Sequence, residues 1–171
     1  MNFSTGAEQP VFRAAKLEDL ADIAALDGEE FGDLCVPHRM LRPLFDLHGS
    51  DWVVAEIDGR VCGYALVCVS AQRRGWLMGL AVAKQYRGRG FGRELLERAV
   101  TSCRTALADS IYLTVKPTEQ NVVKLYEDTG FHRVSREQQY FGEGEPRDVL
   151  AYPIEGPPVT ALSPGQTTNG D

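Results

Sequence analysis

The sequence predicts one domain built on a mixed α/β sheet of about seven strands. At 171 residues the chain has about the length of a single domain, which is enough to bury most of its apolar surface. Short apolar runs alternate with segments of helical apolar periodicity in the order β-α-α-β-β-β-α-β-α-β-β. Asp58-Gly59, between two of the apolar runs, is typical of a tight hairpin.

The first third of the chain is predicted to contain one strand and two helices. Residues 11–15 (VFRAA) are the strand candidate. Residues 17–31 are predicted to form an amphipathic helix, because their apolar side chains recur near the helical period. These side chains are Leu17, Leu20, Ile23, Ala24 and Leu26. A second short helix is expected after Pro37. Its apolar side would consist of Met40, Leu41, Leu44 and Phe45.

Three strands are expected in the middle of the chain. Residues 52–57 and 61–69 are apolar runs separated by Asp58-Gly59. Such a pair supplies the positive φ angles of a type I′ turn, so the two runs are predicted to form a hairpin. Residues 75–82 (GWLMGLAV) follow as the third strand of this group.

Two further helices and three further strands are expected in the second half. From residue 90 to residue 103 the apolar side chains occupy one face of a predicted helix. Residues 111–115 (IYLTV) form a strand, and residues 119–129 form a helix that ends at the next glycine. Residues 131–141 and 147–154 complete the sheet as two strands around the turn GEGEP.

Composition narrows the functional classes. The formal net charge of -6 argues against a general nucleic-acid binder. No apolar run reaches the roughly 18 residues of a membrane span, and the N-terminus has neither the basic start nor the apolar stretch of a signal peptide, so a cytoplasmic protein is expected. The four cysteines lack CxxC spacing and are expected to be small buried residues, with no metal site.

Basic residues concentrate in one segment. Seven basic and two acidic residues fall between Arg73 and Arg98, whereas the rest of the chain is strongly acidic. A cationic island in an acidic chain favours an anionic ligand at the island. The acidic remainder either attracts a cationic partner or consists of ordinary solvated charges.

Residues 85–96 (QYRGRGFGRELL) place three glycines at alternate positions among arginines, directly before a predicted helix. The first turn of a helix has backbone N–H groups without partners and carries partial positive charge, and an anion satisfies both. Glycine removes the Cβ atoms that would keep a phosphate away from the backbone, and arginine adds charge-assisted hydrogen bonds. The segment is therefore interpreted as a pyrophosphate-binding turn.

Two other phosphate-binding motifs fit this segment less well. A P-loop requires Gly-Lys-Ser/Thr at its end, where this chain has Phe91-Gly92-Arg93. A Rossmann fingerprint has the spacing G-x-G-x-x-G in the first βα unit, whereas this chain has G-x-G-x-G after four candidate strands. A glycine-rich turn with solvated arginines is the remaining alternative.

Two motifs resemble those of the GCN5-related N-acetyltransferase (GNAT) superfamily. Gln85-Tyr86-Arg87-Gly88-Arg89-Gly90 matches the family signature Q/R-x-x-G-x-G/A, and Gly92 continues its glycine spacing. Asn121, Tyr126 and Gly130-Phe131 are similar to the family's later Asn, Tyr and Gly-Phe motif. The chain is loosely similar to the ribosomal-protein alanine and protein N-alpha-acetyltransferase branch of this superfamily.

The resemblance also implies a fold and domain limits. Residues 10–154 would form the GNAT domain, with a mostly antiparallel sheet that is splayed between its fourth and fifth strands. Residues 1–9 are expected to be a flexible N-terminus. Residues 155–171, rich in Pro, Gly and Thr, are expected to be a disordered tail.

The resemblance implies that acetyl-CoA is the cosubstrate and lies between the two splayed strands. The backbone of Leu80, Ala81 and Val82 would hydrogen-bond the pantetheine arm, and Asn121 would help to fix this arm. The pyrophosphate would be held by Arg87, Gly88, Arg89, Gly90, Phe91, Gly92 and Arg93. For Asn121 the alternative role is that of a polar residue at a helix end.

The implied reaction is direct attack of an amine on the thioester. Tyr126 would protonate the leaving thiolate, because a phenol of pKa ~10 is protonated at neutral pH. A backbone N–H near Leu80 would stabilise the developing oxyanion. The alternative for Tyr126 is a core tyrosine on an amphipathic helix.

The sequence departs from the family pattern at the general base. Some members have a Glu in the fourth strand, but residues 75–82 contain no carboxylate. The ribosomal-protein alanine branch has a Glu in an L-E-V-R stretch, where this chain has Thr114 in L-T-V-K. No base is assigned from the sequence. The candidates are Glu119, Glu56, Glu30 and His38.

The acceptor is expected to be a primary amine, in the first place a protein or peptide N-terminus. Tyr140 is a candidate substrate contact, because residues 140–145 and 148–150 loosely resemble the ending of protein Nα-acetyltransferases. Glu30, in an acidic segment between the first two helices, is a second candidate. A small-molecule amine such as a polyamine, an aminoglycoside or another antibiotic is the runner-up, and a non-catalytic CoA-binding sensor is the third alternative. A monomer or a homodimer is expected.

Overall fold

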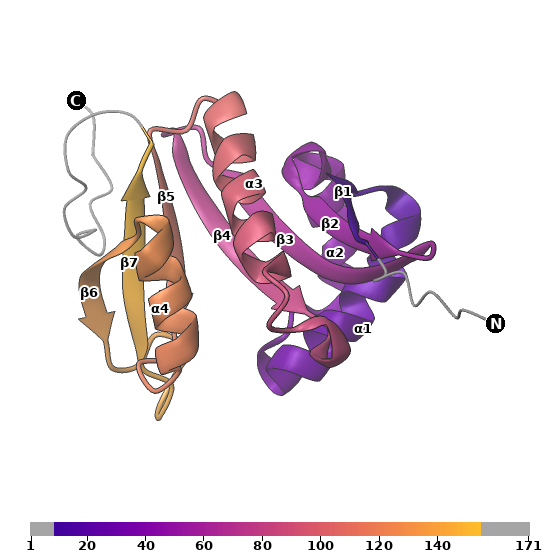
Figure 1. Cartoon of the computed structure of the whole chain (residues 1–171). Coiled ribbons are helices and arrows are strands. Elements are labelled where there is room, and N and C mark those ends of the chain that lie inside the picture. The colour runs from indigo at the N-terminus through magenta and orange to yellow at the C-terminus, as the bar shows by residue number, and fades with distance from the viewer. Residues whose placement is uncertain (1–8, 155–171) are drawn as a thin grey trace.

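Seven strands form one sheet in the order β1-β2-β3-β4-β5-β7-β6, and helices cover both of its faces (Figure 1). The computed structural model describes residues 9–154, so the predicted tail (155–171) and the predicted N-terminal segment (1–9), except residue 9, lie outside the described residues. In chain order the elements are β1 (Val11–Ala14), η1 (Leu17–Asp19), α1 (Leu20–Phe31), η2 (Gly32–Leu34), α2 (His38–His48), η3 (Gly49–Asp51), β2 (Val53–Ile57), β3 (Arg60–Val69), β4 (Arg74–Val82), η4 (Lys84–Tyr86), α3 (Phe91–Thr105), β5 (Ser110–Val115), α4 (Gln120–Thr129), β6 (His132–Glu137) and β7 (Arg147–Pro153). The predicted order of helices and strands is confirmed.

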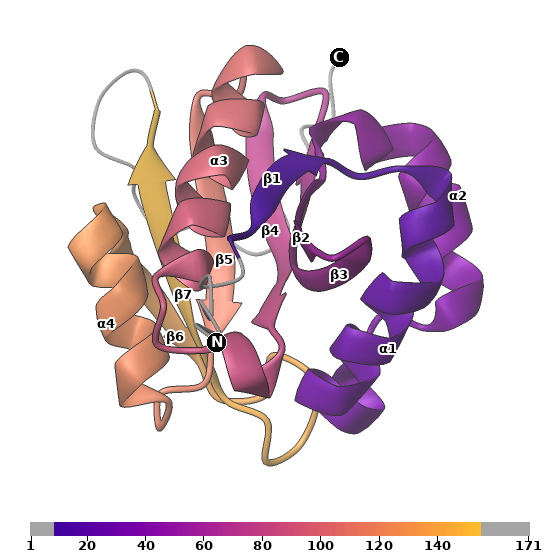
Figure 2. The same cartoon turned by 45° about the vertical axis from the view of Figure 1, so that its right-hand side comes forward.

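The helices divide between the two faces of the sheet (Figure 2). One core lies beneath α3 and α4 and includes Val53 and Ala55 of β2. The other lies beneath α1 and α2 and includes Val54, the residue between them. This division follows from the strand, since successive side chains point to opposite faces. Among residues 9–154, no helix is long and apolar enough to cross a membrane.

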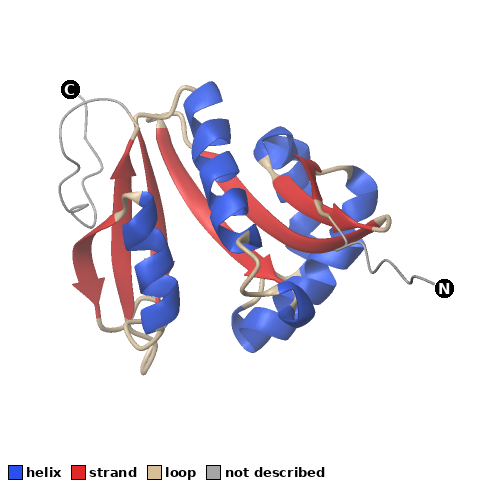
Figure 3. Cartoon of the chain, in the orientation of Figure 1, coloured by secondary structure: helices blue, strands red, loops and turns tan. Residues whose placement is uncertain are grey.

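The fourth and fifth strands separate, as the resemblance implied. β4 and β5 form the one parallel pair of the described sheet, and they pair only through residues 74–76 of β4 and 110–112 of β5. Beyond this point the two strands diverge, which is visible in Figure 3 as two strands that spread apart. The sheet is otherwise antiparallel.

A β-bulge reorients β4 where it leaves β5. Leu66 of β3 pairs with Gly79 and Val67 pairs with Leu77, so Met78 is the extra residue. Leu77 packs in the core beneath α3, whereas a Cβ on Gly79 would lie 3.1 Å from the Tyr64 ring on the opposite face. Residues two apart normally share a face, so the bulge changes which side chains of β4 face each core.

The last predicted strands differ in length from the observed ones. The strand predicted at residues 131–141 ends at Glu137 as β6. The chain turns after this point, and the N–H of Gly142 donates to the Gln139 carbonyl at 3.1 Å. Gly142 has a φ of +115°, a value that favours glycine and is incompatible with a continuing strand.

The predicted hairpin turn is confirmed, whereas the prediction for the cysteines holds for two of the four. Asp58 and Gly59 have φ angles of +50° and +76°, as a type I′ turn requires. Cys62 and Cys103 are buried free thiols. Cys35 and Cys68 are partly exposed, because one lies in the segment between α1 and α2 and the other near the end of β3.

A buried ion pair fixes β1 to the start of the first helical segment. The Asp19 carboxylate, with 6% of its side chain exposed, accepts hydrogen bonds from the Arg13 guanidinium at 2.7 and 2.8 Å. It also accepts one from the Lys16 backbone N–H at 2.7 Å. Arg13 in turn donates to Glu56 of β2 at 2.7 Å. Burial alone would raise the pKa of Asp19, but these hydrogen bonds lower it below its ordinary value.

The α1 helix is fixed to the sheet by the buried carboxylate of Asp27. This carboxylate accepts a hydrogen bond from the Tyr64 hydroxyl of β3 and one from the backbone N–H of Val36 at 2.5 Å. Burial raises the pKa of Asp27 above its ordinary value, although both hydrogen bonds lower it in part. The contact holds the end of α1 and the following residues 32–37 beside β4.

Replacement of Arg13 should destabilise the fold in a pH-dependent way. We expect Arg13→Gln to lower the free energy of unfolding by about 2 kcal/mol at neutral pH, because a buried carboxylate loses its cation. Because the folded-state pKa of Asp19 is lowered, its carboxylate stabilises the fold at pH values above the unfolded-state pKa of about 3.9. This stabilisation is lost as the pH falls through the folded-state pKa. The difference between wild type and variant should therefore shrink at about pH 3, as measured by urea denaturation.

Arg42→Gln is the matched control for this measurement. It breaks only the exposed pair with Asp46, in which more than half of each side chain is exposed. Such pairs contribute about 0.5 kcal/mol or less, so the control should unfold close to the wild-type midpoint. Equal losses in the two variants at neutral pH would contradict the role of Arg13.

Tyr64→Phe should destabilise the fold by about 1–3 kcal/mol, because the buried Asp27 carboxylate loses its hydroxyl donor. The pKa of Asp27, already raised, should rise further, and the loss should diminish as acid protonates this carboxyl group. Urea denaturation at several pH values measures both effects. Tyr112→Phe is the control, since the Tyr112 hydroxyl has no hydrogen bond to another described residue; an equal loss there would argue against the Asp27 contact.

Candidate active site

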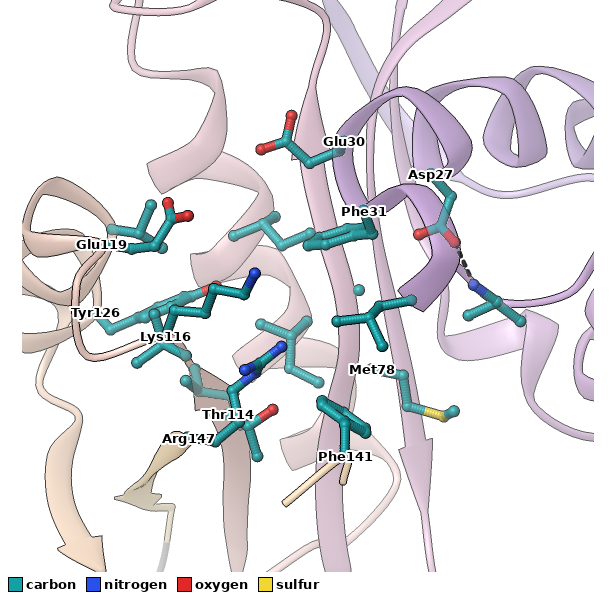
Figure 4. Close-up of a pocket in the computed structure, with 18 residues that line it drawn as sticks. Asp27, Glu30, Phe31, Met78, Thr114, Lys116, Glu119, Tyr126, Phe141 and Arg147 are labelled. Atoms are coloured by element: carbon teal, nitrogen blue, oxygen red, sulfur yellow. Dashed lines mark hydrogen bonds between the residues drawn. The ribbon is translucent and has the colours of Figure 1, made fainter. Parts of the chain in front are cut away.

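A cleft of about 220 Å³ opens where β4 and β5 separate (Figure 4). Its wall consists of residues 77–80 of β4, residues 113–116 at the end of β5, Glu119, Val122 and Tyr126 from the α4 region, Asp27, Glu30, Phe31, Leu34 and Val36 from α1 and the segment after it, and Phe141 and Arg147 near the start of β7. The cleft is therefore bounded by both halves of the splayed sheet. Side chains from both halves can act on one ligand there.

The edge of β4 that faces the cleft has unpaired backbone groups. In the described part of the chain, β4 pairs with β3 along residues 75–82 but with β5 only along residues 74–76. A linear ligand that contains amides can pair with such an edge as an added strand would. Of the predicted contacts with the pantetheine arm, Leu80 lines the cleft, whereas the side chain of Ala81 is buried beneath α1 and that of Val82 packs toward α3.

The glycine-rich turn leads into the start of α3. Gly88 and Gly90 have φ angles of +74° and +84°, which explains why glycine occupies these two positions. Gly90 is the residue before α3, and it makes no side-chain cap. A Cβ on Gly92 would lie 3.6 Å from Leu125 of α4, an ordinary contact distance. The first N–H groups of this 15-residue helix are thus presented beside a turn that lacks side-chain bulk.

The three arginines of the turn have different partners. Arg87 donates to the Val82 carbonyl at 2.9 Å and pairs with the Glu30 carboxylate of α1. The guanidinium of Arg89 lies 5.4 Å from the centre of the Tyr86 ring. Arg93 lies 3.7 Å from an Asp128 carboxylate oxygen on α4. All three pairs are partly exposed, so a stronger anion can compete for these side chains.

Tyr126 lies in the wall of the cleft, as a catalytic role requires. Its side chain comes from α4 and is directed into the cleft in Figure 4. Only 6% of the residue is exposed, and its ring packs 5.9 Å from that of Phe131. Burial, and secondly the charge of Glu119, raises the pKa of Tyr126 above its ordinary value. The hydroxyl group is therefore protonated at neutral pH and can donate a proton.

The structure separates the four candidate bases. Two of them, Glu30 and Glu119, line the cleft. Asp27, which was not among the four, also lines it. Glu56 is paired with Arg13 at 2.6 Å, outside the cleft wall. His38 is exposed at the start of α2, also outside the wall. Among residues 9–154, His, Cys, Asp and Glu side chains form no group of three that could hold a metal ion.

Two other predicted contacts lie outside the wall of the cleft. Asn121 is the second residue of α4 and is exposed. Tyr140 packs with Tyr112 and Val149 in a small core on the face of the sheet that bears α1 and α2. The neighbouring Phe141, rather than Tyr140, lines the cleft. The roles assigned to Asn121 and Tyr140 stay predictions.

Sequence reasoning missed three charged side chains in the wall of the cleft. Asp27 was one of several acidic residues in a predicted helix, and only its packing against Tyr64 distinguishes it. Lys116 follows the end of β5 and Arg147 begins β7, next to the last pair of the ladder, Val115 with Asp148. Their approach depends on the strand register, which no local motif encodes.

Comparison with known sequences identifies the family. The family model described as "Acetyltransferase (GNAT) family" matches residues 17–131. An N-alpha-acetyltransferase from Sulfurisphaera tokodaii is 28% identical over 158 residues, which cover 83% of this chain and 92% of that protein. N-alpha-acetyltransferase 30 from Xenopus laevis is 33% identical over 147 residues, which cover 82% of this chain and 54% of that protein.

Solved structures have the same fold. A structure of the NatC complex bound to Gag peptide and CoA superposes with a TM-score of 0.77 at 22% identity, covering 85% of this chain and 98% of that chain. The ribosomal-protein-S18-alanine N-acetyltransferase from Escherichia coli gives a TM-score of 0.75 at 18% identity, covering 91% of this chain and 100% of that chain. The splayed sheet, the glycine-rich turn and the family match lead to one conclusion: the chain belongs to the GNAT family of acetyltransferases and is an acyl-CoA N-acyltransferase.

Proposed function

We propose that this protein transfers the acetyl group of acetyl-CoA to the α-amine of a protein N-terminus. The observation that carries the proposal is the free edge of β4. This edge runs along a cleft whose wall includes Tyr126, Glu30 and Glu119. The proposal also draws support from the relatives, several of which are named N-alpha-acetyltransferases.

The residues present fit acetyl-CoA. The N–H groups at the start of α3 and the side chains of Arg89 and Arg93 would hold the pyrophosphate. Arg87 would join them on exchanging its exposed partner Glu30 for a phosphate oxygen. The free edge of β4 around Leu80 would hydrogen-bond the amides of the pantetheine arm, and Asn121 would contact the same arm. The thioester would then lie near Tyr126, in the cleft.

The proposed reaction is a direct transfer. The acceptor nitrogen forms a bond to the acetyl carbonyl carbon while the carbon–sulfur bond breaks, and the buried hydroxyl of Tyr126 gives its proton to the leaving sulfur. A free N–H at the bulged part of β4 stabilises the negative charge on the carbonyl oxygen. Glu119 or Glu30, directly or through water, accepts the proton that the amine loses. No covalent enzyme intermediate forms.

The carboxylates of the cleft favour an α-amine over a lysine side chain. At a pH of about 7.4, deprotonating a lysine of pKa ~10.4 costs about 4 kcal/mol, whereas an α-amine of pKa ~7.7–8.0 costs less than about 1 kcal/mol. Of the three carboxylates, Asp27 is occupied by two hydrogen bonds, and Glu30 becomes available only when Arg87 exchanges it for a phosphate oxygen. Glu119, Glu30 and water are left to remove the proton, and this weak set of bases suits an amine that is already partly neutral.

Tyr126→Phe tests the catalytic role. We expect kcat/KM for acetyl transfer to fall by about 100-fold or more, because the leaving thiolate loses its proton donor. Binding of CoA, measured by calorimetry, should stay within about threefold. Tyr152→Phe, which changes a tyrosine outside the cleft wall, is the control and should keep full activity. Unchanged transfer by Tyr126→Phe would remove this residue from the mechanism.

The dependence of rate on pH tests the acceptor. Thiol release should be measured with unblocked peptides, Nα-blocked lysine peptides, spermidine and kanamycin. For unblocked peptides kcat/KM should rise with pH and level off near the α-amine pKa of about 8. It should not fall up to about pH 10, because burial raises the pKa of Tyr126 above its ordinary value. Preference for the blocked lysine peptides or for either small amine would overturn the proposed acceptor.

A further inference from the structure

We propose that the acceptor carries a carboxylate close to its amine and that Arg147 and Lys116 bind it. The inference rests on the proposed function and specifies its substrate class. For a protein substrate, this means Asp or Glu among the first residues of the chain. The same chemistry is present in a free amino acid, whose carboxylate also lies beside its amine.

Arg147 is a buried cation with unused donors. Only 5% of the residue is exposed, yet it lines the cleft. Its Nη1 atom donates to the Glu145 carboxylate at 2.9 Å and to the Pro146 carbonyl at 2.7 Å. Its Nε and Nη2 atoms make no hydrogen bond to another described residue. No fully buried side-chain nitrogen or oxygen of the described residues is without a partner, so these two atoms retain access to solvent.

The unused donors have the geometry that a carboxylate needs. The Nε and Nη2 atoms of a guanidinium present parallel N–H groups that match the two oxygens of a carboxylate. The ring of Phe141, 4.9 Å from the guanidinium carbon of Arg147, packs on one side and limits its orientations. A cation that is fixed in this way loses little entropy on binding an anion.

The register between β5 and β7 places Lys116 beside Arg147. Val115 of β5 pairs with Asp148 of β7 in an antiparallel ladder, so the next positions, Lys116 and Arg147, are opposite each other. Opposite residues of an antiparallel pair project from the same face. Lys116 and Arg147 both direct the nitrogen ends of their side chains into the cleft (Figure 4).

Within the group formed by Lys116, Arg147 and Glu145, the two cations outnumber the one carboxylate. One carboxylate, that of Glu145, serves both cations: it lies 2.9 Å from Arg147 and 3.9 Å from Lys116. Glu30 and Glu119 line the same cleft, so both signs of charge face one ligand. An acceptor with an amine and a nearby carboxylate can meet both sets of charges at once, whereas an uncharged N-terminal residue meets only one of them.

Apolar side chains at the same cleft strengthen this recognition. Phe31, Leu34, Met78 and Phe141 are all large, exposed and part of the cleft wall. A bound acceptor would cover them and exclude water from the ion pair. Charge pairs are stronger where water is excluded, and apolar contact with the acceptor adds to the binding.

Matched peptides test the inference on the wild-type enzyme. The substrates are C-terminally amidated peptides that differ only in Glu against Gln at residue 1 or at residue 2. We expect kcat/KM to be about tenfold or more higher for Glu at one of these positions, as charge-assisted hydrogen bonds imply. Ratios within about twofold at both positions would overturn the proposal.

Variants assign the preference to the two cations. In Lys116→Gln and in Arg147→Gln, the ratio of kcat/KM for the Glu peptide to kcat/KM for the Gln peptide should fall at least threefold. In Lys116→Glu this ratio should be lower than in either of these two variants. Lys124→Gln, which neutralises an exposed lysine of α4 outside the cleft wall, should keep the wild-type ratio. Because Arg147 is buried, its variant is assayed only where its circular dichroism and melting temperature match the wild type. A wild-type ratio in Lys116→Gln would refute the role of Lys116.

Free amino acids separate this inference from the proposed function. If the amidated peptides are acetylated without regard to Glu or Gln, protein N-termini remain the acceptors and carboxylate recognition fails. If free glutamate is acetylated but no amidated peptide is, the proposed protein acceptor fails. Carboxylate recognition is then supported only if kcat/KM for free glutamate is about tenfold or more above that for its amide and Lys116→Gln lowers this ratio.

Discussion

The early end of the β4–β5 pairing is the constraint on which the rest of the structure depends. The two strands share only residues 74–76 and 110–112, and a bulge at Met78 follows on β4. Had the pairing continued, the backbone of β4 would be hydrogen-bonded to β5 and the cleft would be closed. The halves of the sheet are held together instead by one hydrophobic core, which contains Leu77 of β4, Leu113 of β5 and Tyr126 of α4. Burial of each large apolar side chain contributes about 1.5–3 kcal/mol, so this core replaces the missing ladder.

Two different surfaces meet near the end of β4, beside the cleft. One is the turn of Gly88 and Gly90, which leads to the first N–H groups of α3. The other is the end of α1, which lies against the sheet through the contact between Asp27 and Tyr64. Arg87 connects them, since it reaches both the end of β4 and Glu30. Its ion pair is too exposed to contribute more than about 1 kcal/mol, so it can exchange for an anionic ligand at low cost.

Most of the fold was predictable because its signals are local. Apolar periodicity distinguishes the helices from the strands, and the Asp58-Gly59 hairpin follows from turn chemistry alone. The strand predicted through residue 141 was too long, because aromatic residues at 140 and 141 have strand propensity although they lie in a turn next to Gly142. Strand propensity depends on packing partners, and these partners are distant in the sequence.

The residues of the candidate site also differ in whether a local signal identifies them. The phosphate turn and Tyr126 each belong to one short segment, so a motif could identify them. Arg147 entered no motif, because its position in the cleft requires the β5–β7 register, the turn that brings Phe141 over its guanidinium, and the separation of β4 from β5. None of these features is local. A chain that retains the same two motifs can therefore bind the same cofactor, while a shift of one residue in this register would move Arg147 to the opposite face of the sheet and change the acceptor it recognises.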